Sequence, residues 1–374
     1  MVHVHLRFIK GLMMIHIVIG TKAQLIKMAP IMKLLQEKGV NYNFISTGQH
    51  KHTISEMLAD FQIKVPDSYL YSGKDITSIP QMVLWGGLNL LRTALQRNKF
   101  FRGDTRGIVL VHGDTFSTLL GALMAKFAGL QVAHVESGLR SFHLLEPFPE
   151  EIIRILTFHF SDYLFCPDEN AVRNLNGHKG EKVKTDGNTL YDAMRIAIEN
   201  APNRERIRIP EKPYVIGTIH RFENIHTAQS LQKIVNIIER IAQDYLVIFV
   251  LHKPTQKQLQ KHGFLQKLSS NPNIELHQRY SYFDFLTLIS RAKFLVSDGG
   301  SNQEECYYMG KPILLLRRAT ERLEGIGENA LLSEYKMELV EQFLASPEFF
   351  ARPPRSYAHS PSAKIVDVCC QFAN

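Results

Sequence analysis

The sequence predicts an α/β protein with two doubly wound, Rossmann-like domains that face a cleft. Short β-branched runs alternate with longer stretches of helical periodicity, a pattern typical of βαβ units and parallel sheets. The alternation occurs twice, on either side of a proline-rich and charged segment at 201–213. The length of 374 residues also suits two domains, because domains contain about 100 to 200 residues each.

The first half of the chain contains four strand-like runs, Ile15–Ile19, Asn43–Thr47, Gly107–His112 and Gln131–Val135. After the first run, apolar residues recur every three or four positions, which places them on one face of a helix. These residues are Leu25, Met28, Ala29, Met32 and Leu35. We therefore expect an N-terminal α/β domain over residues 1–200, with the residues before Met13 forming an extension.

Residues 201–213 contain three prolines and no helix or strand period, and this composition indicates a linker. A second series of strand-like runs follows at Tyr214–Ile219, Leu246–Leu251, Phe294–Val296 and Ile313–Leu316. Helical stretches lie between and after them at Ala228–Ala242, Phe283–Ala292 and Gln303–Met309. The second α/β domain is thus predicted over residues 214–358, and we expect the C-terminal helix, 361–374, to pack on the first domain.

Composition excludes several classes of protein. Hydrophobic residues make up 45% and charged residues 21% of the chain, which argues against a disordered or fibrous protein. Four scattered cysteines predict no disulfide framework and a cytoplasmic location. No apolar run is long enough to cross a membrane. The net charge of +8 suits an anionic ligand, and no basic run interleaved with aromatics predicts binding to nucleic acid.

The first strand ends at Gly20-Thr21-Lys22, with Lys27 one turn into the following helix. A helix N-terminus offers unpaired N–H groups and a positive dipole end, and lysines beside it favour a phosphate. An ordinary solvated helix start with surface lysines is the alternative. The segment is neither a Walker loop nor a dinucleotide-binding glycine motif.

Three acids are expected at the carboxyl edge of the first sheet. Asp114 and Glu136 each follow a strand, and Glu150 opens a helix. Asp114 is alternatively a helix cap, and Glu150 with Arg154 an i,i+4 surface pair. Three acids at one edge would raise one another's pKa, which would make them proton-transfer groups.

In the second half, His220 and Arg221 follow a strand, although a buried structural histidine is the alternative for His220. The segment from Ser297 to Glu305 is a glycine turn between a strand and a helix, which lets a ligand approach the backbone closely. Arg322 follows the next strand and adds a cation. This edge is expected to recognise phosphate and ribose.

Taken together, an ordered set of motifs resembles the UDP-N-acetylglucosamine 2-epimerase family across most of the chain. The motifs are Gly20-Thr21-Lys22, Lys27-Met28-Ala29-Pro30, Gln49-His50, His112-Gly113-Asp114-Thr115, His134 to Arg140, Pro149-Glu150-Glu151, His220-Arg221, Gln303-Glu304-Glu305 and Thr320-Glu321-Arg322. The resemblance implies a glycosyltransferase-B-like fold that binds the nucleotide in the interdomain cleft.

The resemblance also implies roles for individual residues. UDP would bind mainly to the second domain, with Phe285 beside uracil, Glu305 on the ribose, and His220 and Arg322 facing phosphates. The glycine turn would approach the diphosphate. Lys22 and Lys27 would reach the diphosphate from the first domain, while Asp114, Glu136 and Glu150 would surround the sugar. The remaining predicted substrate-binding residues are Gln49, His50, Arg140, Arg154, Arg221, Gly299, Gly300 and Ser301.

Several positions depart from the family pattern. The usual Gly-Thr-Arg-Pro-Glu opening is Gly-Thr-Lys-Ala-Gln here, so Lys22 replaces an arginine and Gln24 replaces an acid. Lysine attracts a diphosphate without the two-pronged geometry of arginine. The usual Asp-Ser-Gly-Gly turn is Asp-Gly-Gly-Ser, which moves the hydroxyl to Ser301, and Arg318 stands where an aspartate is common.

The function that these features imply is epimerisation at C2 of a UDP-linked 2-acetamido sugar, of the UDP-GlcNAc to UDP-ManNAc type. UDP would be eliminated, a glycal formed and UDP added back, with Asp114, Glu136, Glu150 and His220 as catalytic residues and neither cofactor nor metal. The alternatives are a hydrolysing epimerase, a glycosyltransferase-B-type UDP-sugar transferase and a non-catalytic sensor. Gln49, His50, His220 and His252 favour the non-hydrolysing branch. The expected partner is the UDP-sugar, and a homodimer is left open.

Overall fold

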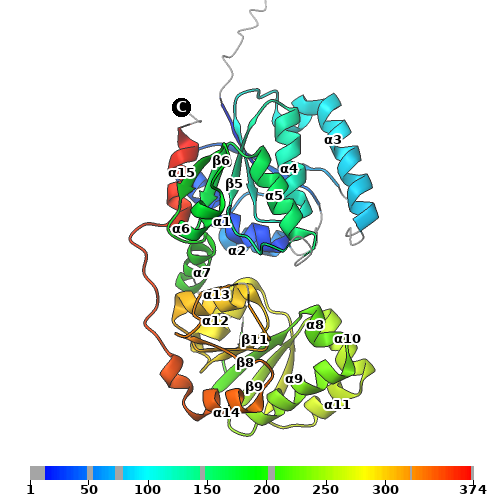
Figure 1. Cartoon of the computed structure of the whole chain (residues 1–374), viewed down its shortest axis with the longest axis vertical. Helices are drawn as coiled ribbons and strands as arrows, with labels where there is room; N and C mark the ends of the chain where they lie inside the picture. Colours follow the sequence, from blue (N-terminus) through cyan, green and yellow to red (C-terminus); the bar gives the residue numbers. More distant parts are fainter. Residues whose placement is uncertain are drawn as a thin grey trace, which may run out of the picture. The chain divides into compact units, whose positions relative to one another are not determined.

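A computed structural model describes residues 13–48, 54–71, 79–143, 148–200, 207–320 and 322–371, apart from the side chains of 79, 80, 82, 83, 94 and 96–98. The chain divides into two compact units (Figure 1). Unit 1 comprises residues up to 193 together with those from 357 onward, and unit 2 comprises residues 194–356. The extension predicted before Met13 lies outside the described residues, as does the first part of the linker, 201–206.

Unit 1 contains a seven-stranded parallel sheet. In spatial order its strands are β3 (Ser68–Tyr69), β2 (Tyr42–Ser46), β1 (Ile15–Ile19), β4 (Ile108–His112), β5 (Gln131–Val135), β6 (Tyr163–Cys166) and β7 (Glu181–Lys184). Every residue of β1, β2 and β4 is buried. Strands covered on both faces have nearly continuous apolar sequences. The sequence pattern identified these three strands for that reason.

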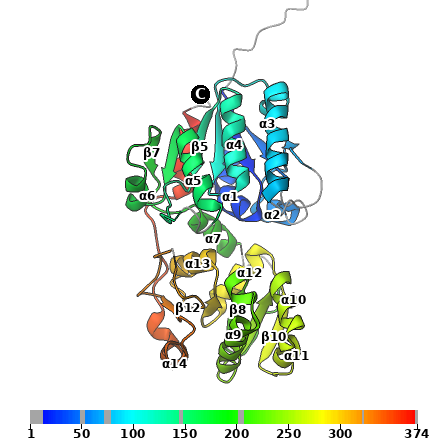
Figure 2. The ribbon, with the colours of Figure 1, turned by 45° about the vertical axis from the view of Figure 1, so that its right-hand side comes forward.

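Helices cover both faces of this sheet (Figure 2). Helices α3 (Ile79–Phe101), α4 (Phe116–Phe127) and α5 (Glu150–Phe160) pack side by side. Helix α1 (Lys22–Glu37) packs against α2 (Ile54–Phe61) and α15 (Pro361–Cys370). The short α6 spans Glu169–Asn174, and α7 spans Leu190–Glu199, across the boundary of the two units.

The C-terminal segment returns to unit 1 and is tied there by polar contacts. The Ser362 amide donates to Asp192 Oδ2 at 2.8 Å, and Lys38 Nζ donates to Asp367 Oδ1 at 2.8 Å. Ile365 and Val366 of α15 are buried. Helix α15 is therefore part of the unit 1 core.

Unit 2 contains a six-stranded parallel sheet. Its spatial order is β10 (Ile274–Gln278), β9 (Leu246–Leu251), β8 (Tyr214–Ile219), β11 (Leu295–Ser297), β12 (Ile313–Leu315) and β13 (Ala330–Leu332). The helices are α8 (Phe222–Ile225), α9 (Ala228–Ile241), α10 (Lys253–Lys261), α11 (Phe264–Ser269), α12 (Tyr282–Arg291), α13 (Gly300–Met309) and α14 (Met337–Ala345), followed by a 3-10 turn at Pro347–Phe350.

The predicted fold class, two doubly wound α/β units, is confirmed. The strands that the sequence pattern did not identify are β3, β6, β7, β10 and β13. Several are short or lie at an edge: β3 has two residues, and β7 reads Glu-Lys-Val-Lys, with no fully buried position. Such strands lack the apolar run that marks a central strand. In the part of the chain that the structure describes, no helix is long and apolar enough to span a membrane.

Candidate active site

The three central strands of unit 1, β1, β4 and β5, are neighbours in the sheet. All three run parallel, so their carboxyl ends lie at one edge. In open α/β sheets this edge is where ligands bind. The segments that follow these strands begin with Gly20-Thr21-Lys22, Gly113-Asp114 and Glu136-Ser137. The structure thus brings the predicted lysines and two of the three predicted acids, Asp114 and Glu136, to one edge.

Helix α1 starts at this edge with a capping box. Thr21 accepts a hydrogen bond from the Gln24 amide at 3.3 Å, and Gln24 Oε1 accepts one from the Thr21 amide at 3.1 Å. These bonds satisfy backbone donors that a helix start leaves unpaired. Lys22 lies half-buried in the first turn, and Lys27 is buried in the second. The predicted helix start therefore exists, and Gln24 helps to cap it.

Glu136 lies beside Lys27 and His112. Lys27 Nζ is 2.7 Å from Glu136 Oε1 and 2.5 Å from Oε2, and His112 Nε2 is 3.0 Å from Oε2. All three side chains are more than nine-tenths buried. Glu136 adopts a φ of 63°, a region that is uncommon outside glycine and that marks functional turns.

Asp114 and Arg140 are connected through two residues of helix α5. Arg154 Nη2 donates to Asp114 Oδ2 at 2.5 Å, and its Nη1 donates to Glu151 Oε2 at 3.3 Å. Arg140 Nε donates to Glu151 Oε1 at 2.5 Å. Glu151 is completely buried, and these arginine hydrogen bonds, together with one from the Ser141 amide, hold its pKa below the ordinary value although burial alone would raise it.

Glu150 differs from the other two predicted acids. Its Oε2 is buried and accepts no hydrogen bond from any residue that the structure describes. The i,i+4 pair with Arg154, the alternative for this position, does not form, since Arg154 contacts Glu151 and Asp114 instead. A buried carboxylate oxygen without a partner is costly, so Glu150 is a candidate for contact with a ligand.

His134 supports the turn that carries Asp114. Its Nε2 lies 2.7 Å from the Gly113 carbonyl, and Ser137 Oγ lies 3.1 Å from its Nδ1. Burial lowers the pKa of His134 to about 4. The neutral ring thus donates from Nε2 to Gly113 and accepts at Nδ1 from Ser137. Sequence reasoning did not assign this role, nor those of His112 and Glu151, although all three lie inside the motifs it identified.

In unit 2, Asp298 organises the end of β8. This fully buried carboxylate accepts hydrogen bonds from the His220 amide at 3.1 Å, the Arg221 amide at 2.9 Å and Asn224 Nδ2 at 2.8 Å. It also lies 3.2 Å from His220 Nδ1. Burial lowers the pKa of His220 against the opposing effect of Asp298. The exposed imidazole stacks on His252, with ring centroids 4.7 Å apart.

The glycine turn leads from β11 into helix α13. A Cβ atom at Gly299 would lie 2.9 Å from His220 Cε1 and 2.7 Å from Asn302 Oδ1, so a larger residue here would displace these two side chains. Gly300 is the first residue of α13, and Ser301 is exposed at its start. The turn therefore lies directly beside the His220 ring.

Two adjacent acids of helix α13 have different partners. Glu305 is buried and accepts a hydrogen bond from Asn302 Nδ2 at 3.1 Å. Glu304 accepts one from Tyr308 at 2.8 Å and one from Arg322 Nη1 at 2.6 Å. Gln303 donates to the carbonyl of Arg322 at 3.0 Å. The predicted phosphate ligand Arg322 is thus held beside the helix start by two neighbouring residues.

The remaining predicted residues are distributed as follows. Phe285 lies half-buried in α12, and Arg221 pairs with Glu223 at 3.4 Å. Gln49 and His50 lie outside the described residues. Over the described ranges, no group of three or more His, Cys, Asp or Glu side chains is arranged to hold a metal ion.

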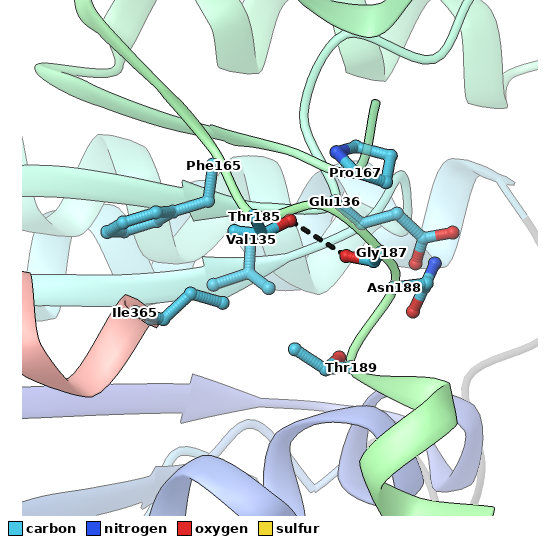
Figure 3. A pocket seen from close by; sticks show the side chains of 9 residues that line it. All are labelled: Val135, Glu136, Phe165, Pro167, Thr185, Gly187, Asn188, Thr189 and Ile365. Atoms are coloured by element: carbon cyan, nitrogen blue, oxygen red, sulfur yellow. Dashed lines mark hydrogen bonds between the residues drawn. The ribbon is translucent and has the colours of Figure 1, made fainter. Parts of the chain in front are cut away.

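A pocket borders Glu136 within unit 1 (Figure 3). It lies among the ends of β5, β6 and β7 and helix α15. The segment that follows β7 forms one wall, braced by a hydrogen bond of 2.8 Å from Thr185 Oγ1 to the Gly187 carbonyl. Thr189 Oγ1 is buried there without a partner among the described residues. The lining residues are Val135, Glu136, Phe165, Pro167, Thr185, Gly187, Asn188, Thr189 and Ile365.

Comparisons with known proteins identify the family of this chain. The sequence model of a family described as UDP-N-acetylglucosamine 2-epimerase matches residues 32–345. A protein named UDP-N-acetylglucosamine 2-epimerase from Methanocaldococcus jannaschii is 32% identical, over 88% of this chain and 91% of that protein. A protein of the same name from Campylobacter jejuni is 31% identical, over 87% of each chain.

Two solved structures are similar along nearly the whole chain. The Methanocaldococcus jannaschii UDP-GlcNAc 2-epimerase in complex with UDP-GlcNAc and UDP has a TM-score of 0.76 at 29% identity, covering 96% of this chain and all of that one. The Neisseria meningitidis UDP-GlcNAc 2-epimerase bound to UDP-GlcNAc has a TM-score of 0.80 at 27% identity, with the same coverage. The chain therefore belongs to the UDP-N-acetylglucosamine 2-epimerase family.

Proposed function

We propose that this protein epimerises C2 of a UDP-linked 2-acetamido sugar, interconverting sugars of the UDP-GlcNAc and UDP-ManNAc type without net hydrolysis. Family membership and the UDP-GlcNAc complexes of its relatives support the substrate class. The observation that supports the chemistry is the unpartnered oxygen of Glu150. Glu150 begins α5, the helix whose Arg154 contacts Asp114.

The reaction requires elimination because no carbonyl group acidifies the C2 proton. The bond between C1 and the diphosphate oxygen breaks, a carboxylate takes the C2 proton, and the electron pair forms the C1–C2 double bond of a glycal. A proton then returns to the opposite face of C2, and UDP adds back to C1. Two faces require more than one acid or base, a task that Asp114, Glu136 and Glu150 would share.

The leaving UDP gathers negative charge, and preorganised donors would stabilise it. In unit 2, His220 and Arg322 would face the phosphates beside the turn at Gly299. Phe285 would lie beside uracil and Glu305 on the ribose. In unit 1, Lys22 would reach the diphosphate. Lys27 would act chiefly on Glu136, the group it contacts.

One experiment tests the proposal and separates it from its alternatives. The protein is incubated with UDP-GlcNAc in deuterated water, and the products are analysed by NMR and mass spectrometry. Deuterium at C2 of an intact UDP-sugar is expected. Free sugar with stoichiometric UDP would instead indicate a hydrolysing epimerase. Unlabelled substrate would exclude epimerisation and favour a transferase or a sensor.

We further propose a homodimer through helix α3. Four leucines, Leu84, Leu88, Leu91 and Leu95, expose between 48% and 76% of their surface. Their spacing of four, three and four residues fits a heptad seam, which a second helix with the same spacing complements. Such a surface matches itself across a two-fold axis, and α3 contains no acidic residue that would pair with a basic partner.

A further inference from the structure

We propose that Gln24 is a positioning residue for this reaction: it fixes the turn that carries Asp114 against the start of the helix that carries Lys22 and Lys27. The inference rests on the proposed function, because the reaction needs the cations and the acids in one geometry. It concerns a buried amide side chain at the start of α1.

Gln24 connects two helix starts through four hydrogen bonds. Its Oε1 accepts from the Gly20 amide at 2.9 Å and from the Thr21 amide at 3.1 Å. Its Nε2 donates to the His112 carbonyl at 2.7 Å and to Thr118 Oγ1 at 2.9 Å. The first two bonds hold the start of α1, and the last two hold the end of β4 and the start of α4.

These four bonds use the whole amide. The group offers two N–H donors and two acceptor lone pairs, and each has a partner in this site. The Gln24 side chain is 2% exposed, so water cannot replace a lost partner. A carboxylate could still accept from Gly20 and Thr21, but it could not donate to His112.

The His112 carbonyl is well placed to transmit this restraint. It also accepts a hydrogen bond of 2.6 Å from Thr118 Oγ1, and it lies two residues before Asp114. The imidazole of the same residue lies 3.0 Å from Glu136 Oε2. Gln24 therefore acts on both Asp114 and Glu136 through His112, without a place of its own in the chemistry.

The substitution Gln24→Glu converts this restraint into a pH-dependent one. When ionised, the introduced carboxylate places an acceptor oxygen against the His112 carbonyl and repels it. When protonated, the introduced carboxyl group again donates a hydrogen bond there. Turnover of Gln24→Glu relative to wild type should therefore be highest at low pH and fall as pH rises, while the capping box at Thr21 persists.

The experiment compares wild type, Gln24→Glu, Gln24→Leu and a control, Thr227→Ala. Thr227 caps α9 by accepting from the Ser230 amide at 3.1 Å, so its loss removes a helix cap in unit 2, whereas Gln24 belongs to unit 1. Deuterium incorporation by wild type first establishes the reaction. Measurements are kcat over about pH 5.5 to 8.5, UDP affinity, melting temperature, and hydrogen exchange of residues 112–118.

We expect Gln24→Leu to lower kcat by about 10- to 100-fold, the loss typical of catalytic groups misplaced by about 1 Å. UDP affinity should be unchanged. Hydrogen exchange over residues 112–118 should be faster than in wild type. Gln24→Glu should match wild type most closely at the lowest pH. Thr227→Ala should keep its kcat.

A merely structural role would lower the melting temperature alone and leave kcat and its pH profile unchanged, which would overturn the inference. Parallel pH profiles of Gln24→Glu and wild type would do the same. An inactive wild type would refute the proposed function instead. In that case, faster exchange of residues 112–118 in Gln24→Leu would still support the restraint by Gln24. Unchanged exchange would refute the restraint.

Discussion

The Lys27 ammonium and the Glu136 carboxylate form an ion pair in which Nζ contacts both oxygens, at 2.5 and 2.7 Å. Both side chains are more than nine-tenths buried. Removing one member of such a pair leaves an uncompensated buried charge. The two residues should therefore behave as one unit in mutagenesis, whatever contact Lys27 makes with substrate.

Lys27→Met is expected to destabilise the protein by about 3 to 5 kcal/mol, since Glu136 then lacks its cation. The double variant Lys27→Met with Glu136→Gln should recover much of this loss because it removes both charges. Urea denaturation of the two single variants and the double variant measures the coupling. Additive losses would mean that the pair does not act as a unit.

Glu150→Gln should abolish epimerisation and leave UDP affinity and stability near the wild-type values, because no described protein group bonds to its buried oxygen. Glu136→Gln should also abolish turnover with UDP still bound. Isothermal titration and the C2 exchange assay measure the two properties. If both variants kept turnover within about tenfold, these acids would not transfer the protons.

Glu151 provides the matched contrast to Glu150. Its lowered pKa means that the folded protein favours the ionised form. The corresponding stability is present above the unfolded pKa of about 4.3 and is lost as pH falls through the lower folded value. Glu151→Gln should therefore be markedly less stable than wild type at pH 7, with a smaller gap near pH 4. A constant gap in denaturation midpoints would contradict this assignment.

Lys22→Arg should retain activity or tighten UDP binding by at most about 1 to 2 kcal/mol, because guanidinium gives a diphosphate two parallel donors. Lys22→Ala should lower turnover severely. The control is Lys33→Ala, on the same helix but paired with Glu37 at 3.2 Å. It should leave turnover and UDP affinity unchanged. Loss of activity in Lys22→Arg alone would show that unit 1 does not grip the diphosphate as proposed.

Leu88→Glu and Leu91→Glu should convert the proposed dimer into a monomer, since each buries a charge in an apolar seam. Sedimentation velocity of the wild type and both variants tests this. The control is Leu323→Glu, in unit 2, where a leucine is 76% exposed. A monomeric wild type that binds anionic lipid vesicles through these leucines would assign the face to a membrane instead.

The sequence by itself determined the α/β class, the two series of strands, and the positions at strand ends where polar residues gather. These features depend on local periodicity and on the rule that parallel strands end at one edge. Asp114, Glu136 and His220 were identified in this way. Each lies just after its strand, as the pattern indicated.

Only the tertiary structure determined which charged side chains form ion pairs with one another. Lys27 pairs with Glu136 across 109 positions, and Arg154 contacts Asp114 and Glu151 although Glu150 is also within one helical turn. Sequence spacing reports which side chains share a helix face, but an ion pair between elements depends on strand order and side-chain reach. Burial then sets its strength, because water no longer screens a pair such as Lys27 and Glu136.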